Sequence, residues 1–431
     1  MSSENFNHLI LLIGTNPLPN FVVADYFLQH NQNIQTISLI HSEPNPLQAG
    51  TNSQAENLER LLRERWEDKL QSLQFPLSKI PLSDVSHARS IQNDIHEFMM
   101  EKLENADGVH LNYTGGTKSM STHLYWILKS TEELKRRPSF SYLDARNFRL
   151  VDDDRDELIA DDLRKNIDLT FEELIALHGF ERINKPSTAD FSEAAKTFRE
   201  LIENDQLHLF YEDGGYDRNI FENKNKKGEF AESKSQLDRE KINVFDPNDV
   251  FQSVISKMPE EYRLFDEKGS FNWDMSKRQF KKYFKKSVRF LGGTWFEEYV
   301  ESMVENGLKN KPLKIETNWV IKKPDWPAKA DFELDVLLLH GYHFTGISCT
   351  THDKKDLCKN KGFEIIHRTR QIGGDEAKAV LITFLDNSVK DMLQWELVYE
   401  TGGKDNILIL GNEDLKADRL VSEIKKFVFG E

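Results

Sequence analysis

The chain has 431 residues, of which 38% are hydrophobic, 11% aromatic and 30% charged. This length suggests two or three domains, and the composition is typical of a soluble globular protein rather than a disordered one. No apolar run is long enough to cross a bilayer, and residues 1–5 lack the basic start of a signal peptide. We therefore expect a cytoplasmic protein that makes no contact with a membrane.

The net charge of −15 argues against a protein that coats nucleic acid nonspecifically, because that function needs a basic face. The two cysteines, Cys349 and Cys358, form no CxxC or Cys/His array, so neither a disulfide framework nor a zinc site is expected. A local basic patch remains possible on one predicted helix, as a contact for nucleic acid or as a merely solvated face. Its members are Lys277, Arg278, Lys281, Lys282, Lys285, Lys286 and Arg289, opposite Phe280, Phe284 and Phe290.

Residues 1–165 alternate short apolar runs with amphipathic segments, which is typical of a Rossmann-like, mostly parallel sheet with helices on both faces. The last two predicted strands, 139–144 and 148–151, are expected to form a hairpin that closes the sheet. In chain order we expect strand 8–13, helix 18–29, strand 34–40, helix 54–74, a segment 79–83, helix 85–103, strand 108–112, a helix to 129, and strands 139–144 and 148–151.

Residues 166–288 are interpreted as a helical connector, for which a winged-helix remnant is one hypothesis. We expect a short helix opening at 171–174 and a longer one over 191–204 with Asp190 as its N-cap. The stretch 213–246 is rich in Asp, Asn, Lys, Glu and Gly, so it is predicted to be a mobile surface insertion.

Residues 289–431 predict a second α/β core, in which a helix leads into a short mixed sheet. The expected elements are helix 294–306, strands 315–321, 332–339 and 344–349, a basic helix, strands 379–385 and 406–410, and a last helix over 415–427.

The loop Thr114-Gly115-Gly116-Thr117-Lys118 follows a predicted strand and precedes a predicted helix. This position places backbone N–H groups and a helix N-terminus at the carboxyl edge of a parallel sheet, where anionic ligands bind. The glycines permit close approach, and the threonines and Lys118 add hydroxyls and a cation. The loop is not a Walker A motif, because Thr117 separates Gly116 from Lys118. A plain strand-to-helix turn with a capping threonine would use the same residues.

From Asn112 to Lys118 the loop resembles the signature of CARF domains, the sensors of cyclic oligoadenylates in type III CRISPR antiviral defence. In that family a second loop, after the first strand, also lines the ligand. CARF domains pair as two-fold dimers around a ligand that is itself symmetric, so the resemblance implies a homodimer around one ring. It implies ligand contacts from Gly14, Thr15, Asn16, Pro17, Asn112, Thr114, Gly115, Gly116, Thr117 and Lys118.

The layout of residues 289–431 resembles a PD-(D/E)xK nuclease core, in which carboxylates bind Mg²⁺ or Mn²⁺ for phosphodiester cleavage. Glu297 or Glu298 on the first helix and Asp335 on a strand are the expected carboxylates, with Glu297 and Asp335 as metal ligands. Glu333 and Asp335 share one face of that strand and so address one cleft.

The next strand departs from the nuclease pattern, because Ser348 and Thr350 stand where (D/E)xK requires a carboxylate and a lysine. A lysine from the following turn, Lys355, is the expected substitute. The segment 361–374 resembles the helix after the catalytic strands of CARF-fused nucleases. Arg368, Gln371 and Glu364 would then face the cleft.

Three functions are compatible with these residues. The first is a DNA or RNA endonuclease gated by cyclic oligoadenylate, for example cyclic tetra-adenylate. The second is a noncatalytic effector that binds nucleic acid or assembles into larger oligomers on activation, which Ser348 and Thr350 favour. The third is a ring nuclease that degrades its own activator with Lys118 and the loop threonines.

Overall fold

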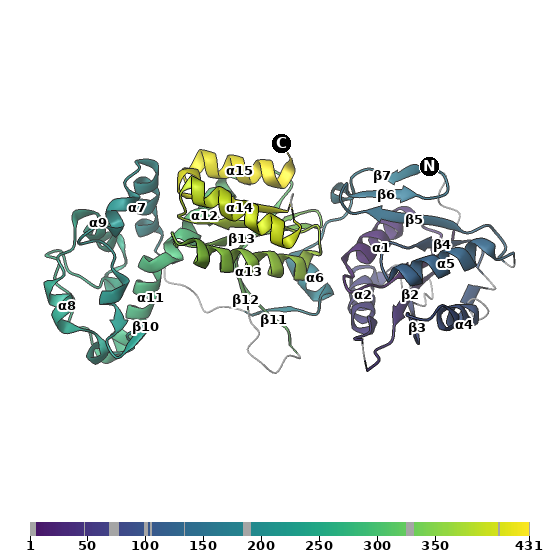
Figure 1. Ribbon diagram of the computed structural model, residues 1–431, viewed down its shortest axis with the longest axis horizontal. Coiled ribbons are helices and arrows are strands. Elements are labelled where there is room, and N and C mark those ends of the chain that lie inside the picture. The colour runs from purple at the N-terminus through teal and green to yellow at the C-terminus, as the bar shows by residue number, and fades with distance from the viewer. Residues whose placement is uncertain are drawn as a thin grey trace.

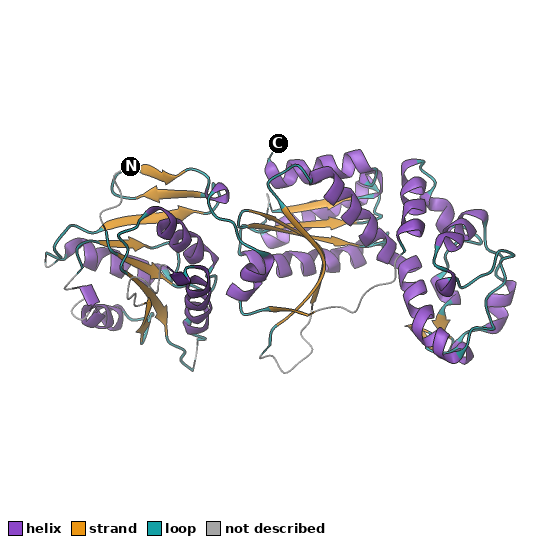
Figure 2. Ribbon diagram, turned by 180° about the vertical axis from the view of Figure 1, so that it is seen from behind, coloured by secondary structure: helices purple, strands orange, loops and turns teal. Residues whose placement is uncertain are grey.

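The computed structural model describes residues 6–46, 48–68, 77–98, 102–103, 106–132, 134–183, 191–324, 332–403 and 406–430. The described chain forms three units in a row, with an N-terminal unit at one end, a C-terminal α/β unit in the middle and a helical unit at the other end (Figure 1). Seen from behind, the two sheets remain separate, and each has its own helices (Figure 2). The predicted α/β fold class is confirmed. No described helix combines the length and apolar character needed to span a membrane.

The N-terminal unit is built on a seven-stranded sheet in the order β3-β2-β1-β4-β5-β6-β7, parallel from β3 to β5 and antiparallel beyond. Every residue of β1 is buried, as expected for a central strand with helices on both faces. The strands are β1 (His8–Leu12), β2 (Thr36–Ser42), β3 (Leu77–Leu82), β4 (Val109–Asn112), β5 (Ser139–Asp144), β6 (Arg149–Asp152) and β7 (Glu157–Ala160). The helices are α1 (Leu18–His30), α2 (Asn52–Arg65), α4 (Ala88–Phe98) and α5 (Lys118–Ser130).

The predicted helices of this unit are shorter in the structure. The one expected over 54–74 ends at Arg65, and residues 69–74 lie outside the described part of the chain. The one expected from residue 85 begins at Ala88, because the carboxylate of Asp84 accepts hydrogen bonds from Ser86 and holds a turn there. Strand β7, which extends the hairpin, was not predicted.

The C-terminal unit carries a six-stranded sheet in the order β15-β14-β13-β12-β11-β8. Its strands are β8 (Glu181–Ile183), β11 (Lys314–Lys322), β12 (Phe332–His340), β13 (His343–Cys349), β14 (Lys378–Ile382) and β15 (Ile407–Leu410). Its helices are α6 (Phe171–Leu177), α12 (Trp295–Leu308), α13 (Lys355–Gly373), α14 (Asn387–Thr401) and α15 (Ala417–Phe429). The unpredicted helix α14 buries Leu393 and Leu397 but exposes Trp395 and Tyr399, so its sequence lacks a clean apolar stripe.

Strand β8 precedes the helical unit in sequence but pairs antiparallel with β11, so this sheet is assembled from two separated segments. The helical unit between them contains α7 (Ser192–Glu203), α8 (Arg239–Val244), α9 (Asp249–Lys257), α10 (Lys277–Gln279), α11 (Lys285–Arg289) and the hairpin β9 (Glu222–Asn223) and β10 (Lys226–Phe230). The expected N-cap Asp190 lies outside the described residues.

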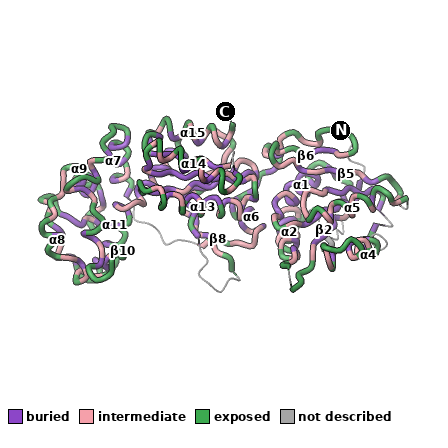
Figure 3. The backbone as a smooth tube through the Cα atoms, in the orientation of Figure 1, coloured by how far each residue is buried: buried purple, intermediate pink, exposed green. Residues whose placement is uncertain are grey.

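The prediction that residues 213–246 form a mobile surface insertion is wrong, because this stretch contributes to a hydrophobic core. Several of its apolar side chains, among them Phe221, Leu237 and Ile242, are buried in one cluster with α7 and α9. Buried and exposed positions alternate along the backbone of the helical unit (Figure 3). Sparse spacing concealed these apolar side chains in the sequence, because periodicity cannot be recognised from isolated apolar residues.

The basic helix is confirmed as amphipathic. It runs from α10 to α11 through a π-helical turn at Phe280–Phe284, and Phe280, Phe284 and Phe290 are buried. All seven predicted basic side chains are exposed on its other face.

The N-terminal and C-terminal units share one continuous cluster of buried apolar residues. The turn between β12 and β13 packs against the segment that leaves the N-terminal unit. A Cβ atom at Gly341 would lie 2.3 Å from the main-chain oxygen of Arg164, so only glycine fits there. Phe148 contacts the ring of His343 with centroids 4.8 Å apart. The two units are therefore in direct contact beside the Gly-Gly loop.

Candidate ligand cavity and carboxylate site

The loops after β1 and β4 lie side by side because those strands are neighbours. A Cβ atom at Gly14 would lie 3.0 Å from the main-chain nitrogen of Gly116, and one at Gly115 would lie 2.0 Å from the main-chain oxygen of Leu12. Gly116 also has a φ of +73°, which favours glycine. Glycine is therefore needed at all three positions to bring the two loops together.

A cavity of 370 Å³ opens beside these loops, which is within the usual size range of small-molecule sites. Six of the predicted ligand-binding residues line it: Gly14, Thr15, Asn16, Thr114, Gly115 and Gly116. The opposite wall comes from the C-terminal unit, through Tyr342, His343, Gly373, Asp375 and Glu376. No motif in the sequence indicated this second wall.

The other four predicted ligand residues are not part of the cavity lining. Asn112 is buried, donates to the hydroxyl of Ser141 at 2.9 Å, and accepts from the main-chain N–H of Thr114. Thr117 caps α5 by accepting from the main-chain N–H of Met120 at 3.2 Å. Lys118 is exposed at the first residue of α5, and Pro17 stands just before α1. These residues shape the loops, while Lys118 places a cation beside them.

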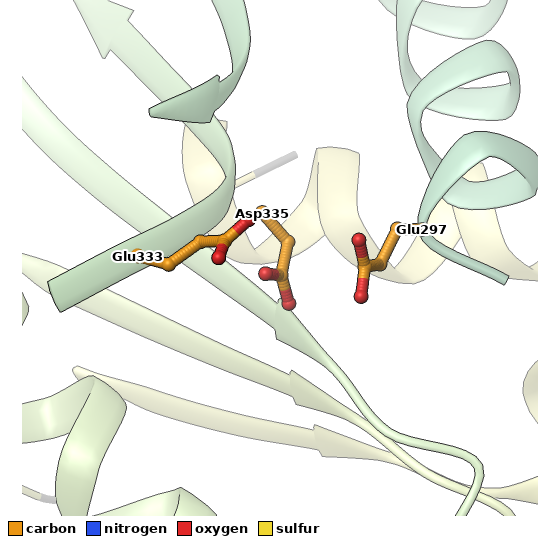
Figure 4. Close-up of side chains that lie close together, drawn as sticks. All are labelled: Glu297, Glu333 and Asp335. Carbon is orange, nitrogen blue, oxygen red and sulfur yellow. The ribbon is translucent and has the colours of Figure 1, made fainter. Parts of the chain in front are cut away.

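The three predicted carboxylates Glu297, Glu333 and Asp335 come together in the C-terminal unit (Figure 4). Glu297 is on the first turn of α12, and the other two are on one face of β12. One oxygen of each lies within 4.8 Å of the others. Glu298, the alternative to Glu297, is not in this cluster.

Asp335 is the buried member of the cluster. Its Oδ2 accepts a hydrogen bond from the main-chain N–H of Cys349 at 2.6 Å and from the hydroxyl of Ser348 at 3.2 Å. The pKa of Asp335 is raised to about 6, because burial and the charge of Glu333 together outweigh those hydrogen bonds and the charge of Lys361. Full ionisation of the cluster therefore calls for additional positive charge.

A cavity of 230 Å³ adjoins the cluster, lined by the three carboxylates together with Ser348, Lys361, Glu364 and Arg368. Lys355, the expected catalytic lysine, is not part of this lining. Its ammonium instead forms an ion pair with Glu396 on α14.

Lys361 is the lysine that lines the cavity, and the sequence reasoning missed it. Its ammonium lies 3.1 Å from the carboxylate of Glu364, also in the lining. Residues 361, 364, 365 and 368 have helical spacing on one face of α13, which was the available signal. Of the residues expected to face this cleft, Glu364 and Arg368 do so, whereas Gln371 accepts a hydrogen bond from Arg368 at 3.0 Å and is not part of the lining.

The donor set fits a divalent metal ion. Carboxylate oxygens are the ligands that Mg²⁺ and Mn²⁺ prefer, and a cation would offset the burial and the repulsion from Glu333 that raise the pKa of Asp335. Glu297, Glu333 and Asp335 are the residues that could hold it.

Fold and site together define an α/β protein in which a Rossmann-like unit with a paired-loop cavity is joined to a second α/β unit with a carboxylate cluster. The same fold is found in the solved structure of Can2 from Sulfobacillus thermosulfidooxidans in complex with cyclic tetra-adenylate, at 17% identity and a TM-score of 0.63 over 98% of this chain and 99% of that one. Protein VC1899 from Vibrio cholerae also shares it, at 14% identity and a TM-score of 0.64 over 97% of this chain and 98% of that one. No protein-family model and no curated protein sequence matches the chain.

Proposed function

We propose that this chain is an effector of type III CRISPR defence, a metal-dependent nuclease that is activated by a cyclic oligoadenylate. The observation that carries the proposal is the presence, in one chain, of a cavity lined by the Gly-Gly loop and of a separate cavity lined by three carboxylates. The fold it shares with Can2, whose structure holds cyclic tetra-adenylate, supports the choice of ligand.

The N-terminal loops would bind the phosphates of the ring. Backbone N–H groups at the start of α5 carry partial positive charge, and Lys118 adds a full charge. A symmetric ring bound by two copies of the same loops requires a homodimer, in which each copy contributes Gly14 to Asn16 and Thr114 to Gly116.

The carboxylate cavity would be the site of phosphodiester cleavage. When bound there, Mg²⁺ or Mn²⁺ would lower the pKa of a water and neutralise charge on the phosphate. The chain's own residues prepare the site: the N–H of Cys349 orients Asp335, and Lys361 and Arg368 supply the positive charge that attracts the DNA or RNA backbone. The exposed basic face of α10 and α11 offers a further contact for nucleic acid.

Helix α13 provides a physical connection between the two cavities. Lys361 and Arg368 near its middle line the carboxylate cavity, and Gly373 at its end lines the ligand cavity. Its 19 residues span roughly 28 Å as one rigid element. A ligand that binds one position of this helix more tightly than another would shift the population of the cleavage-competent state.

A noncatalytic effector is the second candidate, and the observation that favours it is specific. Ser348 on strand β13 and Thr350, directly after its last residue, stand at the two positions where a PD-(D/E)xK core has its carboxylate and lysine. In this alternative, ligand binding changes nucleic-acid binding or the oligomeric state without cleavage.

One experiment separates the two candidates. Full-length protein is mixed with cyclic tetra-adenylate or cyclic hexa-adenylate, with Mg²⁺ or Mn²⁺, and with plasmid DNA or RNA, and both cleavage and particle size are measured. Cleavage that requires ring and metal supports the nuclease. A change of particle size without cleavage supports the noncatalytic effector, and binding of no ring contradicts both.

A further inference from the structure

The wall that the C-terminal unit contributes to the ligand cavity contains two buried polar side chains. Tyr342 is 6% exposed and His343 is 5% exposed, and both line the cavity. The hydroxyl of Tyr342 and Nδ1 of His343 have no hydrogen-bond partner among the described residues. Because buried polar atoms are normally satisfied, two such atoms on neighbouring residues that line one cavity are candidates for hydrogen bonds to a polar ligand.

The hydrogen bonding of His343 determines what kind of ligand atom its ring can take. Its Nε2 lies 2.8 Å from the main-chain oxygen of Glu376, which can only accept, so Nε2 carries the proton. Burial lowers the pKa of His343 to about 3, so the ring is neutral. Nδ1 is therefore a hydrogen-bond acceptor and selects a donor.

The charges on this wall agree with that selection. Asp375 and Glu376 add carboxylates, and the part of the lining that comes from the C-terminal unit contains no lysine or arginine. Such a wall repels phosphate and attracts an amino group. Phosphate would instead be held by the N-terminal loops across the cavity, with the helix N-terminus of α5 beside them.

Phe148, in the turn between β5 and β6 of the N-terminal unit, also lines the cavity and is held in a strained conformation. It has a φ of +58°, in the left-handed region that bulky residues avoid, and the centroid of its ring lies 4.0 Å from the guanidinium of Arg164 and 4.8 Å from the ring of His343. Strained residues of this kind concentrate at functional sites.

We propose that the C-terminal unit forms a base-reading subsite, in which Nδ1 of His343 and the hydroxyl of Tyr342 bind the 6-amino edge of one adenine of the ring. This inference rests on the proposed function. The ligand then bridges the two units, because its phosphates lie on the N-terminal loops and one base lies against the C-terminal wall. Base identity is thereby read by the unit that carries the carboxylate cluster.

The test compares two rings whose bases differ only along the edge that carries position 6. Full-length protein is titrated by calorimetry with cyclic tetra-adenylate and with cyclic tetra-inosinate, in which every 6-amino donor is replaced by an oxygen acceptor and N1 carries a proton. The wild-type protein should bind the adenylate ring about tenfold or more tightly, because the 6-oxygen of inosinate would face Nδ1 of His343, which is also an acceptor. His343→Phe should weaken adenylate binding about tenfold and remove most of the discrimination.

His340→Phe is the matched control, since this histidine lies in the same turn but not in the cavity lining, and it should retain the discrimination. Tyr342→Phe removes one oxygen and should reduce the discrimination even if His343→Phe does not fold. Equal affinity of the wild-type protein for both rings, or full discrimination by both cavity variants, overturns the inference and leaves the proposed function standing. Binding of neither ring by the wild-type protein overturns the proposed function as well.

Discussion

The main-chain N–H of Cys349 donates to Oδ2 of Asp335 at 2.6 Å, which is a short, charge-assisted hydrogen bond. Strand β13 therefore still orients a carboxylate of its neighbour, although it carries neither the acidic residue nor the lysine of the nuclease pattern. Ser348, at the acidic position, adds a second hydrogen bond to the same oxygen at 3.2 Å. The remaining carboxylates come from Glu333 on β12 and Glu297 on α12.

The carboxylate cluster gives the first prediction. Asp335→Ala should abolish activator-dependent cleavage in Mg²⁺ or Mn²⁺, and Glu297→Gln should reduce it about 100-fold or more, because each removes a metal ligand. Glu298→Gln is the control, since Glu298 is adjacent in sequence but outside the cluster. Cleavage rates on labelled DNA and RNA check the prediction, and undiminished cutting by Asp335→Ala would remove the proposed active site.

Lys361 carries the second prediction. Lys361→Ala should reduce cleavage about 100-fold while leaving metal affinity nearly unchanged, because the lysine lines the cavity without being a metal ligand. Lys359→Ala is a matched control: it lies on the same helix but pairs with Glu396 and Glu400 on α14. Equal cleavage rates for these two variants, measured at saturating metal, would exclude a catalytic role for Lys361.

The third prediction concerns the Gly-Gly loop. Lys118→Ala should weaken activator binding about tenfold and reduce its dependence on salt, because one cation near the phosphates is lost. Lys129→Ala, at the other end of α5, should bind normally. Calorimetry at two salt concentrations provides the measurement. Unchanged affinity of the Lys118 variant would contradict the proposal that this loop binds the phosphates of the activator.

The basic face of the helical unit supplies the fourth prediction. The double variant Lys281→Glu and Lys285→Glu should weaken nucleic-acid binding similarly across sequences and lower the salt slope by about 1 per lost phosphate contact. The reversal of two exposed lysines on the hairpin, Lys226 and Lys227, should have little effect. Equal losses from both pairs would indicate a general charge effect rather than a binding face.

Buried histidines make the fifth prediction, on stability. Burial lowers the pKa of His8 to about 4 and that of His110 to about 3, from an unfolded value of 6.5. Below pH 6.5 the unfolded chain binds protons that these folded side chains exclude. The free energy of unfolding should therefore fall with decreasing pH, by up to about 1.4 kcal/mol per pH unit for each histidine.

His110→Gln tests this prediction directly. Between pH 6.5 and 4.5, the free energy of unfolding of this variant should depend less on pH than that of the wild-type protein, by the contribution of one histidine. This holds even if the variant is less stable at pH 7.5 because the hydrogen bonds to Ser139 and Ser141 are lost. Urea unfolding across that range measures the slope. An identical slope in both proteins would show that His110 does not titrate on unfolding.

Local patterns in the sequence predicted the main elements of both sheets, since strand and helix periodicities depend on near neighbours. Alternation along β12 predicted that Glu333 and Asp335 share a face, and they do. Helix α14 and the buried residues of 213–246 were not predicted, because their apolar residues follow no local period.

The choice of lysine shows the limit of such reasoning. Lys355 is nearer in sequence to the altered strand, yet the structure places it against Glu396 and brings Lys361 to the carboxylates. The two lysines lie six residues apart on helix α13, which is fewer than two turns, and only the packing of α13 against α14 and the sheet decides which lysine faces the cavity.

The sequence by itself determined the Gly-Gly loop at a strand end and the acidic residues of the second core, because backbone freedom, helix capping and strand alternation are local properties. Only the tertiary structure decided that β8 completes the second sheet, that Lys361 lies at the carboxylates, and that Tyr342 and His343 line the cavity beside the Gly-Gly loop. Those relationships join segments far apart in the chain through strand pairing and apolar packing, and no local motif in the sequence specifies the partners.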